Sequence, residues 1–414
     1  MNELLLKAEK AKKASYQLSN LSTSIKDSGL QAIADALLNN QMKILEANSI
    51  DLENARKKGI SGALLDRLTL NEKRIASMAE GVLQIKNLPD PIGEVISMWK
   101  RPNNLIIGQK RVPLGVIGII YEARPNVTVD AAALCFKAGN AVILRGGSEA
   151  INSNKAIVHI MNEAMSKVGV PEGSIQLIED TNRETAVEMM KLNKYIDVLI
   201  PRGGAGLIQT VVQNSTVPVI ETGVGNCHIY VDSECDMEMA ERIVINAKTS
   251  RPGVCNAAET LLVDRKIADQ FLPKVLESLK KCNVEIRGCE EVQKVYPDAI
   301  PAKQNEWSKE YLDYILTVKV VDGIDEAISH INKYGTKHSE AIVTTNYNKA
   351  QRFLQEIDAA AVYVNASTRF TDGFEFGFGA EIGISTQKLH ARGPMGLKEL
   401  TTIKYIIYGN GQIR

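Results

Sequence analysis

One cysteine of the chain has a sequence context that suits nucleophilic chemistry. The six cysteines are scattered and form no C-x-x-C pair, which is typical of reduced thiols in a cytoplasmic protein. Cys255 lies in TSRPGVCNAAETLLV, where Pro252 and Gly253 break a preceding helix and place the thiol on an irregular segment. Arg251 provides a positive charge that would favour the thiolate, the form that attacks carbon. From these residues alone, a structural and a catalytic Cys255 are both open.

A glycine cluster has the position of a phosphate-binding turn. Gly203, Gly204 and Gly206 fall in DVLIPRGGAGLIQTV, between an expected strand and an expected helix. The N–H groups at such a junction have no partner within the helix and are well placed to receive a pyrophosphate. The spacing is not G-x-G-x-x-G, so a purely structural turn is the alternative.

Length and composition restrict the class of protein. The chain has 414 residues, enough for two or three packed units, and its 49 basic side chains balance 49 acidic ones. A net charge of zero gives no global attraction to nucleic acid or to an anionic membrane. The N-terminus lacks the apolar run of a signal peptide, no stretch approaches a transmembrane span, and no metal-ligand spacing occurs. We therefore expect a cytoplasmic protein without a metal, a membrane partner or a nucleic-acid partner.

Two alternating series of strands and helices must position these residues. The chain begins with helices up to about Leu88, and Thr69 with Glu72 is predicted to form a capping box. From Gly115 to DVLIP, short apolar runs alternate with helical segments, and a second such series follows Val231. This alternation predicts an α/β fold in which parallel sheets are covered by helices.

Two segments fit neither series. VISMWKRPNNLIIGQKRVP has a Pro-Asn-Asn centre that predicts a hairpin, and the C-terminal TTIKYIIYGNGQIR is rich in β-branched residues. Both are typical of edge strands that need a partner, for which a neighbouring subunit is a natural candidate. A hairpin that covers its own domain is the alternative.

Several ordered blocks resemble the aldehyde dehydrogenase superfamily. EARPNVTVDAAALCFKAGNAVILRGG, the Glu-Thr-Gly of PVIETGVGN and Cys255 occur in the order found in that superfamily. Residues 321–344 and 364–397 resemble, more narrowly, its reductases that act on an acyl phosphate. The likeness covers essentially the whole chain. It implies an aldehyde dehydrogenase-like α/β fold with a Rossmann-type dinucleotide-binding domain, an α/β catalytic domain and a small β oligomerisation element.

The resemblance also implies domain boundaries and a homo-oligomer, either a dimer or a tetramer. The NADP-binding domain is expected at residues 1–97 and 113–230, and residues 386–400 are expected to return to it. The catalytic domain is expected at residues 231–385, and the oligomerisation strands at residues 98–112 and 401–414.

The activity that the resemblance implies is the NADPH-dependent reduction of L-glutamyl 5-phosphate to L-glutamate 5-semialdehyde and phosphate, the second step from glutamate to proline. Cys255 would form a thioester with the substrate, and a hydride would then reduce it. One alternative is an aldehyde dehydrogenase of another substrate class, either non-phosphorylating or acylating with coenzyme A. The other is an inactive scaffold that holds glutamate 5-kinase. The resemblance also leaves open a transient association of the active enzyme with that kinase.

Two further catalytic residues follow from the resemblance. Asn126, in the Arg-Pro-Asn turn, matches the asparagine whose side-chain amide stabilises an oxyanion in the superfamily. A turn or cap residue is the alternative. Glu221 matches the glutamate that activates water in aldehyde-oxidising members. Because a reductase loses product when its thioester is hydrolysed, we expect Glu221 to position groups or to handle the thiol proton instead.

For the adenosine end of the cofactor, the resemblance implies one loop. Arg145 follows the AVIL strand and matches a basic residue near the adenosine ribose. Its guanidinium would pair with a 2′-phosphate, which favours NADP over NAD. Gly146, Gly147 and Ser148 continue the loop, and the Ser148 hydroxyl can donate to phosphate.

The rest of the cofactor is assigned to two segments. Gly203 and Gly204 are expected at the pyrophosphate. Glu310 in KEYLDYIL matches a glutamate that contacts the nicotinamide ribose, although Asp313 and Tyr314 replace the Gly-Pro that usually follows it.

The implied substrate carries a carboxylate and an ammonium, so a cation and several hydrogen-bonding groups should surround it. Arg369 in NASTRF is predicted to bind the carboxylate, and Ser367 and Thr368 to donate from their hydroxyls. Arg251 is a further candidate for substrate binding. A solvated surface arginine is the alternative for Arg369.

Overall fold

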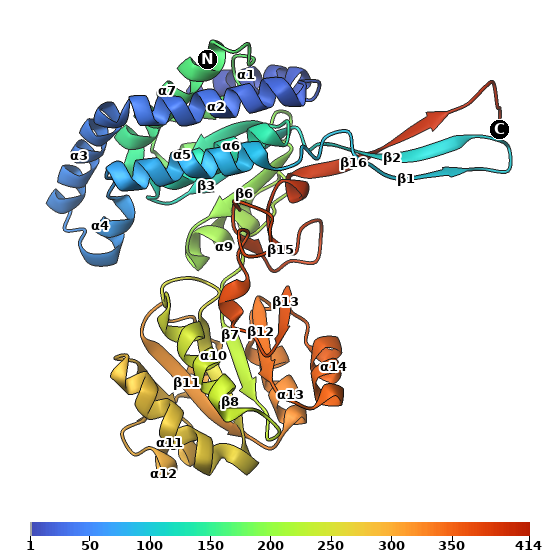
Figure 1. Cartoon of the computed structure of the whole chain (residues 1–414). Helices are drawn as coiled ribbons and strands as arrows, with labels where there is room; N and C mark the ends of the chain where they lie inside the picture. Colours follow the sequence, from blue (N-terminus) through green and yellow to red (C-terminus); the bar gives the residue numbers. More distant parts are fainter. Residues whose placement is uncertain (1) are drawn as a thin grey trace. The chain divides into compact units, whose positions relative to one another are not determined.

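The computed structural model describes residues 2–414, apart from the side chain of Ala63. Its contacts divide the chain into two compact units (Figure 1). The first unit comprises the chain up to Thr222 together with Gly377–Gly383 and Met395–Arg414. The second comprises Gly223–Phe376 and Ile384–Pro394. Each unit is built from strands and helices, as the alternating sequence pattern predicts.

The first unit begins with helices, which confirms the predicted helical start of the chain. They are α1 (Glu3–Leu18), α2 (Thr23–Asn39), α3 (Gln41–Lys57), α4 (Gly62–Leu68) and α5 (Glu72–Asn87). The predicted capping box of Thr69 and Glu72 is wrong. Thr69 ends α4, and the Asn71 side chain caps α5 by accepting a hydrogen bond from the backbone N–H of Arg74. Asn71 stands directly before the helix, and asparagine is a better N-cap than threonine.

A four-stranded parallel sheet follows, with the strand order β5-β4-β3-β6. Its strands are β3 (Val116–Tyr121), β4 (Ala141–Arg145), β5 (Ile175–Leu177) and β6 (Val198–Arg202). The helical segments among them are α6 (Pro125–Lys137), η1 (Ser148–Ala150), α7 (Ile151–Ser166), α8 (Arg183–Met189) and α9 (Ala205–Asn214). The chain leaves the carboxyl ends of β3, β4 and β6 at Glu122, Arg145 and Gly203. In open parallel sheets this is the edge at which ligands bind.

The second unit contains a seven-stranded parallel sheet with the order β10-β9-β11-β8-β7-β12-β13. Its strands are β7 (Cys227–Val231), β8 (Ala258–Asp264), β9 (Glu285–Gly288), β10 (Ile300–Pro301), β11 (Ile315–Val321), β12 (Ser339–Val343) and β13 (Ala361–Val364). The helices are α10 (Met237–Thr249), α11 (Arg265–Lys281), α12 (Glu290–Val295), α13 (Ile324–Tyr334) and α14 (Tyr347–Glu356), with the short turns η2 (Gln304–Ser308) and η3 (Thr368–Phe370).

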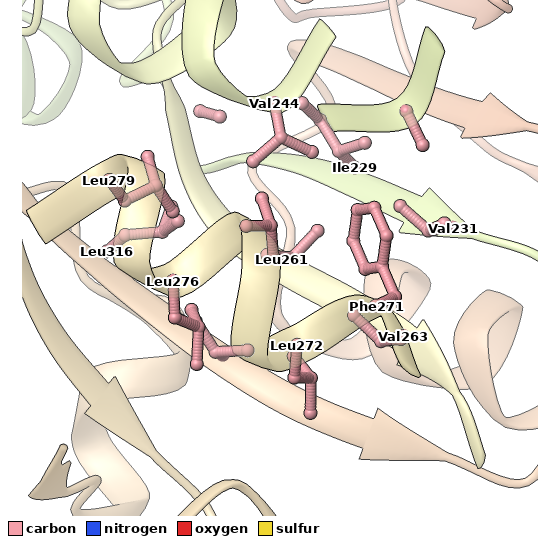
Figure 2. Packing of buried hydrophobic residues seen from close by; sticks show 14 of the residues in the cluster. Ile229, Val231, Val244, Leu261, Val263, Phe271, Leu272, Leu276, Leu279 and Leu316 are labelled. Carbon is pink, nitrogen blue, oxygen red and sulfur yellow. The ribbon is translucent and has the colours of Figure 1, made fainter. Parts of the chain in front are cut away.

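Packing against this sheet fixes the two elements that flank Cys255. Val244 of α10 and Phe271 of α11 lie in one buried cluster with Leu261 and Val263 of β8 (Figure 2). Burying an apolar side chain of this size stabilises the fold by roughly 1.5–3 kcal/mol. Because α10 ends and β8 begins in this core, the ends of the loop between them are held in place.

The boundary between the units differs from the predicted one at residue 230. β7 pairs with β8 and β12, so the apolar run that ends at Val231 continues the second sheet. The contacts therefore divide the chain between Thr222 and Gly223. Near the C-terminus the chain changes unit three times, at residues 377, 384 and 395, in place of the single return predicted for residues 386–400. Within that stretch β14 (Ile384–Ser385) pairs with β15 (Gly393–Pro394), and η4 (Lys398–Leu400) follows.

The two segments predicted as edge strands pair with each other. β1 (Val95–Lys100), β2 (Ile106–Pro113) and β16 (Thr401–Tyr408) form an antiparallel sheet with β2 at its centre. The rings of Trp99 and Tyr405 make an edge-to-face contact with centroids 6.4 Å apart. Met98, Ile407 and Tyr408 are exposed. The sheet thus satisfies the backbone of β2 but leaves large apolar side chains in solvent.

Within residues 2–414, no helix combines the length and the apolar character that crossing a membrane requires.

Candidate active site

Cys255 lies on the irregular loop between α10 and β8, as its sequence context predicts. The loop rests directly on the segment that leads into β7. The thiol of Cys227 donates to the carbonyl oxygen of Cys255 at 3.1 Å. A Cβ atom on Gly225 would lie only 1.6 Å from the same oxygen. Gly225 is therefore a glycine because the backbone of Cys255 passes too close for any side chain.

Four of the other cysteines have environments that disfavour a thiolate. Burial raises the pKa of the Cys135 and Cys227 thiols, and it raises that of Cys235 to about 11. Burial also raises the pKa of Cys289. A thiol held in its protonated form is a poor nucleophile. The half-buried Cys255 remains the best candidate for covalent chemistry.

Positive charge accompanies Cys255 within the second unit. Burial and the charge of Arg251 lower the pKa of the Arg369 guanidinium, whereas Asp372 and Cys255 act in the opposite direction. Arg369 thus interacts electrostatically with both Arg251 and Cys255. Nearby guanidinium groups stabilise a thiolate and can also bind a carboxylate. The structure therefore brings together three of the residues predicted for the site.

Asn256 fixes the position of Arg369. Its amide nitrogen donates to the carbonyl oxygens of Arg369 at 3.2 Å and Thr371 at 2.9 Å. In return, Nη1 of Arg369 donates to the side-chain oxygen of Asn256. Nε of Arg369 also donates to the Ser250 hydroxyl at 3.1 Å. Asn256, the residue after Cys255, therefore aligns the arginine, a role that the sequence did not reveal.

The hydroxyls of Ser367 and Thr368 serve the local turn. The Thr368 hydroxyl donates to the carbonyl oxygen of Asn256 at 2.7 Å and is fully buried. The Ser367 hydroxyl accepts a hydrogen bond from the backbone N–H of Arg369 at 3.3 Å. Since the single hydroxyl proton of Thr368 is already donated within the protein, the structure argues against its predicted donation to a substrate. It holds Asn256, and through Asn256 it holds Arg369.

Glu310 contacts the segment before β7 on which the Cys255 loop rests. Its Oε1 accepts a hydrogen bond from the backbone N–H of Gly225 at 2.7 Å. Burial raises the pKa of this carboxyl group. Glu310 and the Cys255 loop are therefore bound to the same short stretch of backbone, despite the unusual Asp313 and Tyr314 that follow Glu310 in the chain.

In the first unit, Asn126 is exposed at the second residue of α6. Its amide donates to Oδ2 of Asp130 at 3.3 Å. Burial raises the pKa of Asp130 to about 6. The structure thus shows what orients the Asn126 amide.

Glu221 lies at the end of the first unit in a stretch without regular structure.

Arg145 uses its guanidinium within the protein. Nη1 donates to the carbonyl oxygen of Gly146 at 3.1 Å, and Nη2 donates to the carbonyl oxygens of Thr181 at 2.7 Å and Asn182 at 3.1 Å. Burial lowers its pKa. Nε is buried and has no hydrogen-bond partner in the described part of the chain. Arg145 therefore ties two loops together at the end of the sheet.

The remaining loop residues have different environments. A Cβ atom on Gly146 would lie 2.3 Å from Nδ2 of Asn154, so this glycine makes room for a buried amide. A Cβ atom on Gly147 would lie 3.2 Å from the backbone nitrogen of Ala123. Ser148 lines a cavity of about 360 Å³ together with Lys57 and other residues of α3. Of these residues, Ser148 is the one that lines this cavity.

Glu122 occupies the glycine turn before α9. The backbone N–H of Gly204, the N-cap of this helix, donates to Oε1 of Glu122 at 3.0 Å. A Cβ atom on Gly203 would lie 2.7 Å from the Glu122 carboxyl carbon. Glu122 also lines a cavity of about 270 Å³ with Arg67, Arg124 and Glu149 among its other walls. The sequence offered one missed signal, an acidic residue directly after the β3 strand.

Comparisons with known proteins agree with this arrangement. The model of the aldehyde dehydrogenase family matches residues 3–313 and 297–406. The chain is 68% identical over 414 residues to the gamma-glutamyl phosphate reductase of Clostridium botulinum strain Alaska E43, with 100% of both chains covered. It is also 68% identical over 413 residues to the enzyme of that name from Clostridium perfringens strain 13, again with both chains fully covered.

Solved structures extend the likeness. The crystal structure of gamma-glutamyl phosphate reductase from Thermotoga maritima matches with a TM-score of 0.98 and 54% identity over 100% of both chains. An acetylating aldehyde dehydrogenase from Geobacillus thermoglucosidasius shares the fold, with a TM-score of 0.70 and 18% identity over 100% of this chain and 97% of that one. The fold class predicted from the sequence is confirmed. The chain belongs to the aldehyde dehydrogenase family, in the group that contains the gamma-glutamyl phosphate reductases.

Proposed function

We propose that the protein reduces L-glutamyl 5-phosphate to L-glutamate 5-semialdehyde and phosphate with NADPH, in the synthesis of proline from glutamate. The observation that carries the proposal is the Cys255 loop, whose thiol interacts electrostatically with Arg369, which in turn interacts with Arg251. The full-length likeness to enzymes that bear the corresponding name supports the substrate.

In the proposed reaction the Cys255 thiolate attacks the acyl carbon, and phosphate leaves to give a thioester. The bound dinucleotide supplies a hydride. Collapse of the resulting hemithioacetal releases the aldehyde and restores the thiolate. Arg369 and Arg251 favour the thiolate and bind the substrate carboxylate, while Asn256 and Thr368 keep Arg369 in position.

The carbonyl oxygen of the attacked acyl group becomes an oxyanion and needs hydrogen-bond donors. We assign this role to the backbone N–H of Cys255 and, by the family pattern, to the Asn126 amide. Glu221 is assigned the transfer of the thiol proton or the orientation of groups, since water activation would hydrolyse the thioester. The role of Asn126 and the choice of Glu221 as a site residue rest on the family pattern, whereas the role given to Glu221 departs from it.

The loops of the first unit fit a dinucleotide phosphate. The N–H of Gly204 already donates to an anionic oxygen, that of Glu122, and a phosphate oxygen can accept the same hydrogen bond. We propose that Gly203 and Gly204 hold the pyrophosphate, that Ser148 and the Gly146–Gly147 backbone hold the ribose side, and that Arg145 faces the 2′-phosphate. Glu310 is assigned to the nicotinamide ribose.

The dependence of the reverse reaction on phosphate tests this function. Purified protein should oxidise glutamate semialdehyde with NADP only when phosphate is present, because phosphate must attack the thioester to regenerate the acyl phosphate. Sulfate at equal ionic strength should not replace it. Oxidation that proceeds equally without phosphate would identify a hydrolysing aldehyde dehydrogenase, and a requirement for coenzyme A would identify an acylating one.

We also propose that the β1–β2–β16 sheet joins subunits into a homo-oligomer, since it exposes large apolar side chains. Ile407→Lys in β16 should lower the mass measured by light scattering. Ile413→Lys places the same charge outside the strand and should leave the mass unchanged. A monomeric wild-type protein would contradict the proposal. We further propose a cytoplasmic location and a transient association with glutamate 5-kinase. Co-sedimentation with the kinase tests the association.

A further inference from the structure

A buried ion pair closes the base of the loop that carries Cys255. Nζ of Lys248, in the last turn of α10, lies 2.6 Å from Oε2 of Glu259, the second residue of β8. Neither side chain has exposed surface. Lys248 comes shortly before Cys255 in the chain and Glu259 shortly after it, so the pair ties the two ends of the loop together.

The second carboxylate oxygen of Glu259 holds another segment of the site. The backbone N–H of Leu312 donates to Oε1 of Glu259 at 3.1 Å. Leu312 has a φ of 56°, a left-handed conformation that costs a residue other than glycine roughly 1–2 kcal/mol. Such a conformation persists only where the surroundings hold it. Glu310, which binds the N–H of Gly225, lies just before Leu312 in this segment.

The pair adds little net stability. Burial raises the pKa of Glu259 to about 7 and lowers the pKa of Lys248, so both charges are costly to hold there. Replacing a buried ion pair with apolar side chains is often neutral or stabilising by roughly 1–4 kcal/mol. The consequence that depends on the pair itself is geometric, because its atoms connect α10, β8 and the Glu310 segment.

We propose that Lys248 and Glu259 are positioning residues, which hold the Cys255 loop and the Glu310 segment at a fixed separation. This inference rests on the proposed function, in which Cys255 is the nucleophile and Glu310 contacts the cofactor. The two contacts of Glu259 have separate effects. The ion pair with Lys248 fixes the position of the Cys255 loop, and the hydrogen bond from the Leu312 N–H fixes the position of the Glu310 segment.

Two double variants separate these effects. Lys248→Met with Glu259→Gln removes both charges but keeps an amide oxygen for the Leu312 N–H. Lys248→Met with Glu259→Leu removes that acceptor as well. The matched control is Lys274→Met with Glu241→Gln, which makes the same charge change in an ion pair between α10 and α11 away from the loop. Four quantities are measured: thermal midpoint, the rate of Cys255 alkylation by iodoacetamide, kcat, and KM for NADPH.

A displaced loop is expected to lower kcat and the alkylation rate by about tenfold in both variants, since misplacement of about 1 Å can cost 10²-fold. KM for NADPH should rise, by about fivefold, only in the leucine variant, because loss of that contact is worth on the order of 1 kcal/mol. Thermal midpoints should stay close to that of the wild type, and the control should match the wild type throughout.

Unchanged kinetics in the glutamine variant would show that the Lys248–Glu259 pair has only a structural role. If the glutamine variant kept wild-type kcat and alkylation rate, the positioning role would be wrong, and that comparison decides even where the leucine variant fails to fold. An equal rise of KM in both variants would refute the separate role of the Leu312 contact. Alkylation is read without substrate, so a wild-type protein that fails to turn over the acyl phosphate refutes the proposed function and leaves the loop test intact.

Discussion

The Cys255 loop of the second unit and the loops of the first unit that are proposed to bind the dinucleotide differ in how they are prepared for a ligand. The carbonyl oxygen of Cys255 is held by the Cys227 thiol and leaves no room for a side chain at Gly225. In the first unit, two of the groups predicted to bind a cofactor already have protein partners. The N–H of Gly204 donates to Glu122, and Arg145 donates to backbone carbonyls.

This difference shows which half-site must change when it binds. The nucleophile loop is fixed by contacts that a substrate need not replace, so its geometry is available in advance. A dinucleotide bound as proposed would instead displace Glu122 from the N–H of Gly204, and only the difference between the two hydrogen bonds would contribute to affinity. We therefore expect substitutions that move the Cys255 loop to change kcat, and substitutions at the glycine turn before α9 and at Arg145 to change the affinity for NADPH.

Removal of the nucleophile should have the largest effect. Cys255→Ala is expected to lower kcat by at least about 10³-fold, because removing a covalent nucleophile leaves only binding and oxyanion stabilisation. Cys282→Ser, at the end of α11, is the matched control and should retain wild-type turnover. NADPH titration should give an unchanged dissociation constant for Cys255→Ala. Full turnover of this variant would rule out the covalent mechanism for any substrate.

Gly225→Ala should have the second-largest effect on kcat. The Cβ atom of Gly225→Ala would overlap the carbonyl group of Cys255, so the loop must move, and we expect kcat to fall by roughly 10²-fold. Gly204→Ala has room in the first unit, where a Cβ atom would lie 3.6 Å from Glu122. Steady-state kinetics should show a change of KM for NADPH in that variant and little change of kcat. Equal losses of kcat in both would remove the contrast between the two half-sites.

Arg145→Ala should have a smaller effect, confined to the cofactor. Loss of the bonds to Thr181 and Asn182 should raise KM for both NADPH and NADH, because Arg145 ties their loop to the end of β4. A contact with the 2′-phosphate would add about a further tenfold for NADPH alone, as charge-assisted hydrogen bonds are worth roughly 1.5–3 kcal/mol. Parallel titrations with both cofactors check this. An equal rise for both would place the 2′-phosphate away from Arg145.

The sequence predicted the elements of both units better than the contacts within them. Alternating apolar runs identified the strands, and the Pro252–Gly253 break placed Cys255 on its loop. The contact boundary differs from the predicted one because β7 follows the first series without a composition change, and only its pairing with β8 shows which sheet it joins.

The supporting residues of the site were not predictable in the same way. Asn256, Glu259 and Lys248 act through contacts between segments that are distant in the chain or separated by a loop, and no spacing rule relates them. Thr368 was misjudged because a hydroxyl donor looks the same in sequence whether it faces a ligand or a buried carbonyl. Gly225 left a usable signal, since a glycine close before a strand can mark a close backbone approach.

The smallest predicted effect is also the one that tests the exchange of partners in the first unit. Glu122→Gln keeps an oxygen that can accept the N–H of Gly204 but removes the negative charge at the start of α9. NADPH should then bind about two- to fivefold more tightly, since a charge at a helix N-terminus is worth roughly 0.3–1 kcal/mol. The gain should shrink at high salt, which screens exposed charges. Glu163→Gln makes the same charge change on the outer surface of α7 and should leave the dissociation constant unchanged. Weaker binding by Glu122→Gln would mean that the carboxylate contacts the cofactor itself, and the first unit would then be as well prepared for its ligand as the second.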